Sequence, residues 1–395
     1  MADNTQLIAE AVRRGVENIY PTPVALEQLL VSGKKIKLYN GIDPTGRLQV
    51  GHSVVLNKLR QFQDLGHQVI VLIGDFTAMV GDPTDKMAAR KMLSRKEVIA
   101  NTKNYKKQIG KILDLKKTTF KFNSRWLAKM SFTELLTLSS YFTAQQTLAR
   151  DMFKKRISEG KDLYLNEFLY PVMQAYDSVV LDVDLEVGGN DQTFNMLAGR
   201  TLMKKMKQKE KFVLTMKLLA DPSGRKMGKT EGNAIFLDEP ADGMYGKVMS
   251  WTDGMIVPAF ELVTRMPMAE IEQIASELKD GANPKRFKML LAYKIVELYH
   301  GNQAAIKAEE NFKQVFEEGL NPDDILAVKI KERNIVDVLI ASKLVTSRSE
   351  ARRLIAQGGI KVDQKTVIDE KFEIGPIDRD GVIIQKGKRH FVKII

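Results

Sequence analysis

The chain has 395 residues, 44% of them hydrophobic, and its 61 lysines and arginines outnumber its 49 acidic residues to give a formal net charge of +12. It has no cysteine, which excludes disulfides and zinc–thiolate sites, and its four scattered histidines do not suggest a metal cage. No apolar run is long enough to span a bilayer, and residues 1–20 lack the apolar core of a signal peptide. We therefore expect a cytoplasmic protein of two or three domains without a membrane partner. The basic charge favours a polyanion such as nucleic acid, and an ordinary basic surface explains it equally well.

Residues 6–19 and 24–30 show helical periodicity, and a buried strand then leads into residues 39–52, YNGIDPTGRLQVGH. This stretch predicts a strand that runs through a Pro/Gly turn into a helix opening at Gly51 and His52. The first N–H groups of a helix have no partners within the helix, and the helix dipole adds positive potential there. We therefore predict an anion site, suited to phosphate, at this turn.

A second strand is predicted at 68–73, QVIVLI, after a helix that ends at Gly66. Strand, helix and strand make a parallel crossover unit, in which ligands lie beyond the carboxyl ends of the strands. Asp43 falls at one such end, and the loop 74–84, GDFTAMVGDPT, falls at the next. The polar side chains of that loop can face a ligand, although each taken singly is better explained as a turn-capping residue; they are Asp75, Thr77 and Asp82.

Two helical stretches follow. Residues 126–150 have a wide apolar face, which can pack against another subunit or against the core of the same chain. In the second, 170–181, we expect Pro171 in the first turn of the helix. Tyr170, Gln174 and Asp177 stand at i, i+4 and i+7 and so project from one face. A polar pocket and a solvent-exposed stripe explain this face equally well.

Residues 183–192, VDLEVGGNDQ, predict a strand that ends in two glycines, where backbone and ligand can approach closely. Asp191 follows at the carboxyl end, in a position to accept hydrogen bonds from ribose hydroxyls. The loop 221–233, DPSGRKMGKTEGN, carries Lys226 and Lys229, which suit a developing polyphosphate charge. A K-x-x-K loop by itself would mean little.

The rest of the chain changes character twice. Residues 238–332 are helical, with helices expected at 269–278, 285–299 and 303–316. Residues 333–395 combine two short helices, 336–342 and 349–357, with four short β-rich pieces, and three arginines lie close together at 348, 352 and 353. Such a compact basic module is typical of RNA binding.

These motifs together resemble the bacterial-type tyrosyl-tRNA synthetases over nearly the whole chain. LQVGH at 48–52 is similar to the HIGH element of class I synthetases, and KMGKT at 226–230 resembles their KMSKS loop. Tyrosine specificity rests on four further matches: Y-x-G-x-D-P-T at 39–45, G-D-P at 81–83, Y-P-x-x-Q-x-Y-D at 170–177 and G-G-x-D-Q at 188–192. The segment from SKLVTSRSEARRLIAQGGIKV at 342–362 onward resembles the S4 RNA-binding fold.

The resemblance implies an α/β architecture with three domains: a Rossmann-like parallel-sheet catalytic domain at 1–237, an α-helical anticodon-side domain at 238–332, and a small α+β S4-like domain at 333–395. An insertion around 126–150 would form a homodimer interface. The implied reaction joins L-tyrosine and ATP to tyrosyl-adenylate and pyrophosphate, and then transfers tyrosine to the 3′ end of tRNA(Tyr). ATP is a substrate with Mg²⁺ held mainly through the nucleotide, and no protein-bound metal or organic cofactor is expected.

The resemblance also implies roles for individual residues. Tyr39 and Asp177 would hold the phenolic hydroxyl of tyrosine, and Tyr170, Gln174 and Asp82 its α-amino group. The implied catalytic set is His52, Gln49, Lys226, Lys229 and Thr45. The implied ATP-binding set is Asp43, Gly51, Gly189, Asp191, Gln192, Met227 and Lys229.

The sequence departs from the family pattern at three positions. Gly228 and Thr230 replace the serines of KMSKS, and Gln49 replaces the first histidine of HIGH. Two other functions share part of the pattern. A nucleotidyltransferase would use the same phosphate site but would not need the Tyr39–Asp177 pair or an S4-like tail. A non-catalytic RNA-binding relative would keep the tail but not the lysines and pocket carboxylates.

Overall fold

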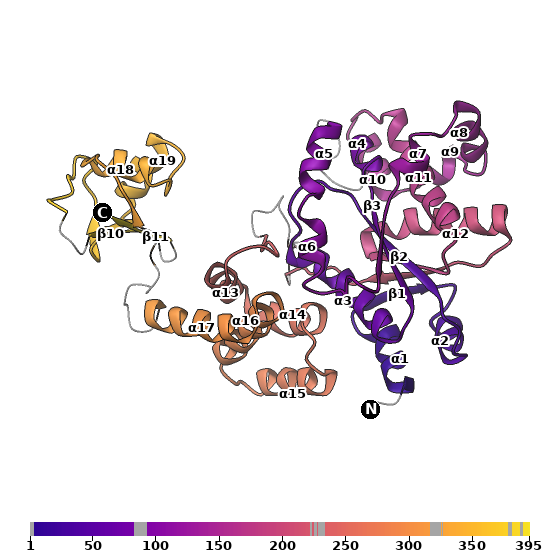
Figure 1. Ribbon diagram of the computed structural model, residues 1–395, viewed down its shortest axis with the longest axis horizontal. Helices are drawn as coiled ribbons and strands as arrows, with labels where there is room; N and C mark the ends of the chain where they lie inside the picture. The colour runs from indigo at the N-terminus through magenta and orange to yellow at the C-terminus, as the bar shows by residue number, and fades with distance from the viewer. Residues whose placement is uncertain are drawn as a thin grey trace. The chain divides into compact units, whose positions relative to one another are not determined.

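A computed structural model describes residues 4–82, 93–221, 223–224, 227, 234–316, 325, 327–377, 381–387 and 390–395. The chain forms two compact units, one made of Met1–Glu239 with Trp251–Tyr299 and the other of Pro240–Ser250 with His300–Ile395. Figure 1 shows their elements. The expected boundaries at 237 and 332 stay a prediction. Within the described ranges, no helix is long and apolar enough to cross a membrane.

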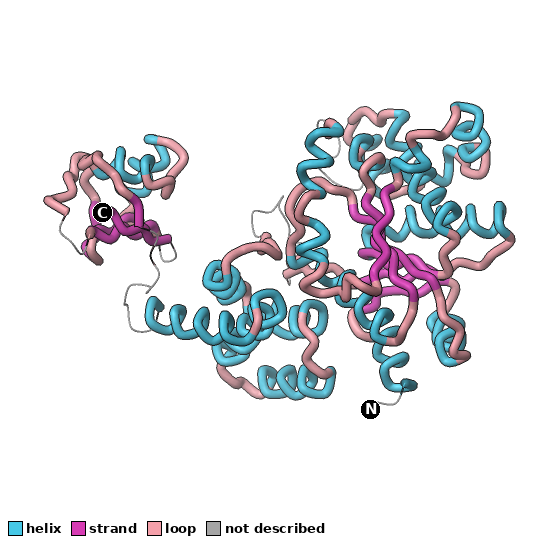
Figure 2. The backbone as a smooth tube through the Cα atoms, viewed as in Figure 1, coloured by secondary structure: helices cyan, strands magenta, loops and turns pink. Residues whose placement is uncertain are grey.

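The first unit is built on a six-stranded sheet, the larger group of magenta strands in Figure 2, with helices around it. Its strands are β1 (Val16–Tyr20), β2 (Lys37–Ile42), β3 (Gln68–Ile73), β4 (Thr118–Phe122), β5 (Leu185–Gly189) and β6 (Phe212–Met216). They lie in the order β1-β6-β5-β2-β3-β4, and all neighbours are parallel except β1 and β6. The chain runs outward from β2 through β3 to β4 and then returns to β5 on the other side of β2. The pair β2 and β5 is therefore the topological switch point, where ligands bind in such sheets.

The predicted helix at 6–19 is wrong in its second half. Helix α1 (Asn4–Arg13) ends before Gly15, which has a φ of +64° that glycine adopts without strain. The chain then forms β1, which pairs antiparallel with β6. This pairing is a contact between segments about two hundred residues apart, and local helical periodicity contains no information about it. Helix α2 (Pro23–Val31) follows with Gly33 after it, as expected.

The expectation for Pro171 is also wrong. Helix α11 (Leu165–Leu181) begins earlier, where the Glu167 side chain accepts a hydrogen bond from the N–H of Tyr164 at 3.0 Å. Pro171 therefore lies inside the helix, where it lacks the N–H that would bond the carbonyl of Glu167. The helix continues past it because α11 packs along α12 (Thr193–Lys207), so tertiary contacts outweigh the lost hydrogen bond.

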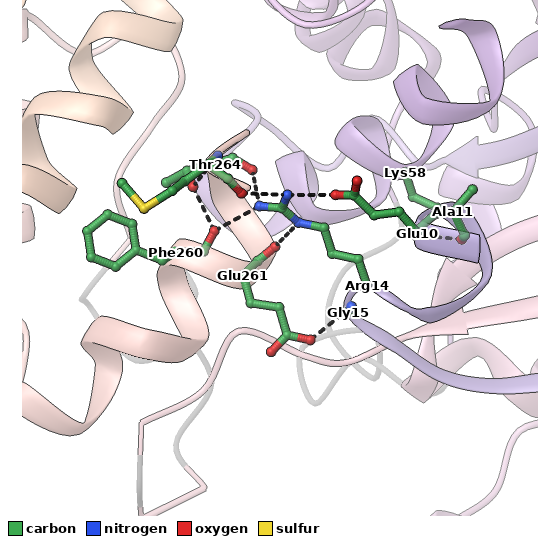
Figure 3. A network of polar contacts seen from close by, with 9 residues as sticks. Glu10, Ala11, Arg14, Gly15, Lys58, Phe260, Glu261 and Thr264 are labelled. Carbon is green, nitrogen blue, oxygen red and sulfur yellow. Dashed lines mark hydrogen bonds and ion pairs between the residues drawn. The ribbon is translucent and has the colours of Figure 1, made fainter. Parts of the chain in front are cut away.

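Arg14 ties the N-terminal helix to α14 (Ile256–Val263), as Figure 3 shows. Its guanidinium donates to four carbonyl oxygens at the end of α14 and to one carboxylate: Phe260 at 3.2 Å, Glu261 at 2.9 Å, Thr264 at 2.8 Å, Met266 at 2.8 Å and Glu10 at 2.9 Å. The last carbonyls of a helix have no partners within it, so one buried arginine satisfies groups that would otherwise be costly to bury. Beside it, the buried Lys58 of α3 (Val50–Asp64) donates to the carbonyl of Ala11 at 2.7 Å.

The remaining helices of the first unit are mostly short. They are α4 (Thr77–Val80), α5 (Arg95–Thr102), α6 (Tyr105–Ile109), α7 (Ser124–Leu127), α8 (Phe132–Ser139), α9 (Ala144–Leu148), α10 (Asp151–Ser158), α15 (Met268–Lys279) and α16 (Pro284–His300), of which the last residue lies beyond the unit. The expected helices at 269–278 and 285–299 are confirmed as α15 and α16. The apolar stretch 126–150 is divided among α7, α8 and α9.

In the second unit, α13 (Ala241–Met249) packs on α17 (Asn302–Phe316). The C-terminal part has a hydrophobic core of its own and a sheet in the order β7-β11-β10-β8-β9. Its elements are β7 (Ala327–Val328), α18 (Ile335–Ala341), α19 (Arg348–Ala356), β8 (Ile360–Val362), β9 (Lys365–Val367), β10 (Val382–Lys386) and β11 (His390–Ile394). The two helices and four β-rich pieces expected here are confirmed, and β7 adds a strand that precedes residue 333.

Candidate active site

Asp43 joins the two halves of the candidate site. It follows β2 at the switch point, where one carboxylate oxygen accepts from Tyr170 Oη at 2.8 Å and the other from Thr77 Oγ1 at 2.7 Å. Burial raises the pKa of Asp43 to about 7, although the two hydroxyl donors lower it. A Cβ atom on Gly74 would lie 1.9 Å from Asp43 Oδ1, so the Asp43 carboxylate can occupy this position only if residue 74 is glycine. Asp43 was expected near ATP and Tyr170 near tyrosine, and the hydrogen bond brings these two sets together.

Asp177 is held from both sides. The residue is 3% exposed. One carboxylate oxygen accepts a hydrogen bond from Trp126 Nε1 at 2.7 Å, and the other accepts one from Asn123 Nδ2 at 3.3 Å. Burial raises the pKa of Asp177 well above its usual range, against the effect of these two donors. Tyr170 is buried as well, so the solvent-exposed stripe is the wrong alternative for this helix face. Neither Trp126 nor Asn123 was predicted as a site residue.

Tyr39 and Gln174 lie on a buried polar network that the sequence did not reveal. Tyr39 Oη lies 3.0 Å from Ser178 Oγ, and Gln174 Nε2 donates to Glu186 Oε1 at 3.0 Å. Glu186 forms an ion pair with Lys211. One signal was present in the sequence: Glu186 is an acidic residue within an otherwise apolar strand.

A hydrogen bond from Gln192 Nε2 to Asp82 Oδ2 at 2.7 Å connects the loops after β3 and β5. Asp191 and Gln192 lie in a short 3₁₀ helix, η1 (Asn190–Gln192), directly after β5. A Cβ on Gly189 would lie 2.6 Å from Asp191 Oδ1, so glycine lets this carboxylate fold back over the strand end. The G-D-P and G-G-x-D-Q motifs are therefore in contact.

The predicted helix opening is the N-terminus of α3. The Nδ1 atom of His52 accepts from the N–H of Gln49 at 3.1 Å, so the hydrogen of a neutral imidazole lies on Nε2. The side chain of Gln49 is half-buried, and its Oε1 is shielded from solvent without a hydrogen-bond partner among the described residues. A Cβ on Gly51 would lie 3.5 Å from the carbonyl oxygen of Met227, so the backbone of Met227 approaches the start of α3 here.

The implied catalytic set has three further members, Thr45, Lys226 and Lys229. Thr45 lies on the exposed turn after β2, where its N–H donates to the carbonyl of Asp43 at 2.8 Å. Lys226 and Lys229 lie outside the described residues. Among the residues that are described, no group of three or more His, Asp or Glu side chains could hold a metal ion.

Comparison with known proteins agrees with this architecture. Residues 32–317 match the family model described as tRNA synthetases class I (W and Y), and residues 313–394 match that of the tyrosine–tRNA ligase SYY-like C-terminal domain. The tyrosine–tRNA ligase of Thermotoga maritima is 42% identical over 389 residues, which cover 97% of this chain and 96% of the relative. That of Shewanella oneidensis is 42% identical over 401 aligned residues, covering 100% and 99%.

Solved structures show the same fold. A C-terminally truncated mitochondrial tyrosyl-tRNA synthetase of Aspergillus nidulans superposes with a TM-score of 0.66 at 24% identity, over 80% of this chain and 95% of that one. The tyrosyl-tRNA synthetase of Archaeoglobus fulgidus, solved in complex with L-tyrosine, has a TM-score of 0.61 at 22% identity, over 78% and 100%. The family models and the full-length relatives lead to one conclusion: this chain belongs to the class I aminoacyl-tRNA synthetases of the tryptophan and tyrosine type and, over its whole length, to the tyrosine–tRNA ligase family.

Proposed function

We propose that this protein activates L-tyrosine with ATP to form tyrosyl-adenylate and pyrophosphate, and then transfers tyrosine to the 3′ end of tRNA(Tyr). The observation that carries the proposal is the polar cluster at the switch point, in which Tyr39, Tyr170, Gln174 and Asp177 are all engaged by hydrogen bonds. A polar cluster at this place suits a substrate with several hydrogen-bonding groups, because the oxygens of these side chains can each accept a further hydrogen bond.

In the phenol subsite, Tyr39 and Asp177 bind the hydroxyl of the substrate. Trp126 and Asn123 each occupy one oxygen of Asp177 and hold the carboxylate in place. A carboxylate oxygen has a second lone pair, which accepts the hydrogen of the phenol. Phenylalanine has no such hydrogen and leaves this lone pair without a donor, so the subsite selects tyrosine.

In the ammonium subsite, Tyr170, Gln174 and Asp82 bind the α-amino group. The hydroxyl hydrogen of Tyr170 is donated to Asp43, which leaves the oxygen of Tyr170 as an acceptor. Asp82 adds negative charge, and its hydrogen bond from Gln192 fixes its orientation. The α-ammonium group, which can only donate hydrogen bonds, is thus surrounded by oxygen acceptors.

ATP lies across the carboxyl ends of β2 and β5. The N-terminus of α3, the Nε2–H of His52 and the amide of Gln49 face the phosphates, with Gly51 allowing close approach. Asp191 accepts from the ribose, beside Gly189 and Gln192. Met227 and Thr45 complete the site, and Lys226 and Lys229 bind the pyrophosphate.

The chemistry needs no protein nucleophile. The tyrosine carboxylate attacks the α-phosphorus in line, a new P–O bond forms, and the bond to pyrophosphate breaks. The protein aligns the two substrates and stabilises the charge that develops on the leaving pyrophosphate. Mg²⁺ enters with the nucleotide and neutralises phosphate oxygens.

For the partners, we infer tRNA(Tyr) binding through the C-terminal part of the chain and a homodimer in the cytoplasm. Three arginines on α19 support the first, since cations there can contact phosphates. Exposed apolar side chains in the 126–150 stretch support the second: Phe132 is 74% exposed and Leu136 56%. Both residues lie on α8, four positions apart and therefore on one face, and contiguous exposed apolar patches often mark protein contacts.

The test is tyrosine-dependent exchange of labelled pyrophosphate into ATP. We expect exchange with tyrosine, little with phenylalanine, and charging of tRNA(Tyr) by the same preparation. No exchange with any amino acid would favour a non-catalytic RNA-binding protein, and exchange without an amino acid a nucleotidyltransferase. Equal exchange with tyrosine and phenylalanine would overturn the proposed specificity.

A further inference from the structure

A buried ion pair lies behind the expected tyrosine pocket. Lys211 is 0% exposed and Glu186 2% exposed, and the two are in direct contact. Glu186 stands on β5 opposite Tyr39 of β2, so both side chains project from the same face of the sheet. Burying two charges is expensive, and a pair of apolar residues of similar size often gives equal or greater stability. The pair therefore calls for a role other than stability.

All three N–H donors of the Lys211 ammonium group have acceptors. Lys211 has three N–H donors, and they meet Glu186 Oε2, Ser178 Oγ at 2.8 Å and the Met196 carbonyl at 3.2 Å. Helix α12 leaves room for this arrangement through Gly199, where a Cβ would lie 2.5 Å from Lys211 Nζ and 2.7 Å from Ser178 Oγ. The surrounding fold is thus shaped around the charged pair.

The other end of the pair faces a predicted substrate ligand. Glu186 Oε1 accepts from Gln174 Nε2 at 3.0 Å. A side-chain amide has a donor end and an acceptor end of almost the same shape, and an ionised carboxylate can only accept. The amide nitrogen of Gln174 is therefore held toward Glu186, and its oxygen is turned away. Lys211 donates to Oε2 of Glu186, which leaves Oε1 to accept from Gln174 and so maintains this orientation of the amide.

We infer that the Glu186–Lys211 pair is a positioning device that sets the orientation of the Gln174 amide, so that the oxygen of Gln174 is offered to the α-ammonium group of the substrate. The inference rests on the proposed function, in which Gln174 is a ligand of that group. An inverted amide would present two N–H donors to a cation. Glu186 and Lys211 act through Gln174 and are not themselves expected to touch the substrate.

The test compares two ligands that differ only in the ammonium group: L-tyrosine and 3-(4-hydroxyphenyl)propanoate. In the double variant Glu186→Leu with Lys211→Met, no charge is left buried and no acceptor holds Gln174. We expect tyrosine to bind about tenfold more weakly or worse, with less than about a twofold change for the analogue. In Glu186→Gln with Lys211→Met, an amide oxygen can again accept from Gln174, and we expect most of the affinity for tyrosine to return.

Two further variants separate the possible failures. Lys58→Met removes another buried lysine, one that donates to the carbonyl of Ala11 in the N-terminal helix, and should alter neither affinity. Gln174→Ala should itself weaken tyrosine selectively, and in that background the Glu186→Leu, Lys211→Met change should have no further effect, because coupled residues are not additive. Equal weakening of both ligands by the double variant, or additive effects with Gln174→Ala, would overturn the inference and leave a purely structural pair. If Gln174→Ala did not distinguish the ligands, the proposed role of Gln174 and this inference would fall together.

Discussion

Replacing Asp177 by asparagine tests the phenol subsite with almost no change of shape. Asparagine keeps one acceptor oxygen and turns the other into an NH₂ donor. Trp126 Nε1 can only donate, so the remaining oxygen must stay at its 2.7 Å contact, and the new NH₂ group faces Asn123 Nδ2. Asn123 cannot invert to relieve this, because its oxygen accepts from the N–H of Phe76 at 2.9 Å and its nitrogen donates to Thr77. The variant therefore places two donors face to face and removes the charge that the substrate hydroxyl would meet.

The expected loss follows from the hydrogen bond to the phenol. A hydrogen bond to a charged group contributes about 1.5–3 kcal/mol, which corresponds to a fall of about 10- to 100-fold in kcat/KM for tyrosine. Phenylalanine makes no such bond, so its kcat/KM should change far less, and the ratio between the two amino acids should narrow. Pyrophosphate exchange, measured with each amino acid over a range of concentrations, gives both values.

A matched control lies directly after the same helix. Asp182 follows the end of α11 with a φ of +50°, a conformation that asparagine tolerates, and its side chain is 52% exposed. Asp182→Asn should leave both kcat/KM values unchanged. If Asp177→Asn kept the full preference for tyrosine over phenylalanine, Asp177 would not recognise the hydroxyl and the assignment of the subsite would be wrong.

Four further predictions concern other parts of the molecule. The pKa of Asp43 is raised to about 7, so the folded protein holds a proton that the unfolded chain loses near its usual value of 3.8, and stability should fall as pH rises through that window. The difference between the folded and unfolded pKa values corresponds to about 4 kcal/mol of stability, and partial exposure of the residue reduces our expectation to about 2 kcal/mol. In Asp43→Asn the melting temperature should therefore fall less between about pH 5 and about pH 8 than in the parent. Identical pH profiles of the two proteins would contradict this. Gln49→Ala should slow exchange and Gln49→His leave it equal or modestly faster, by about tenfold at most, with unchanged tyrosine affinity; parental rates for Gln49→Ala would remove that residue from the site. Lys226→Ala and Lys229→Ala should lower the rate of adenylate formation in single-turnover measurements and leave the affinity for tyrosine unchanged. A weaker affinity for tyrosine with an unchanged rate would disprove their role. A chain that ends before Ala327 should still form adenylate but charge tRNA poorly, with a weaker salt dependence of tRNA binding than the full chain; unimpaired charging would reduce the C-terminal part to a structural appendage.

Much of the fold could be predicted from local sequence. The strand at 68–73 is found with the bounds expected, because a continuous apolar, β-branched run that follows a glycine is typical of a buried parallel strand. The helices of the 268–316 region and the elements after 334 were predicted for the same kind of reason: their periodicity and end signals are local. The strand β1 was missed because it depends on the backbone of β6 for its hydrogen bonds.

In the candidate site, too, local features could be predicted from the sequence and long-range contacts could not. The sequence by itself determined which strands carry polar residues at their carboxyl ends, and the helical spacing placed Tyr170, Gln174 and Asp177 on one face. Only the tertiary structure decided what these groups contact: Asp43 meets Tyr170 across 127 residues of sequence, and Asp82 meets Gln192 across 110. The pairing of Glu186 with Lys211 likewise depends on β5 and β6 being neighbours, and a lysine before a strand carries no local sign of it. Hydrogen bonds and ion pairs act over a few ångströms in space, so their partners follow from the order of strands in the sheet and not from distance along the chain.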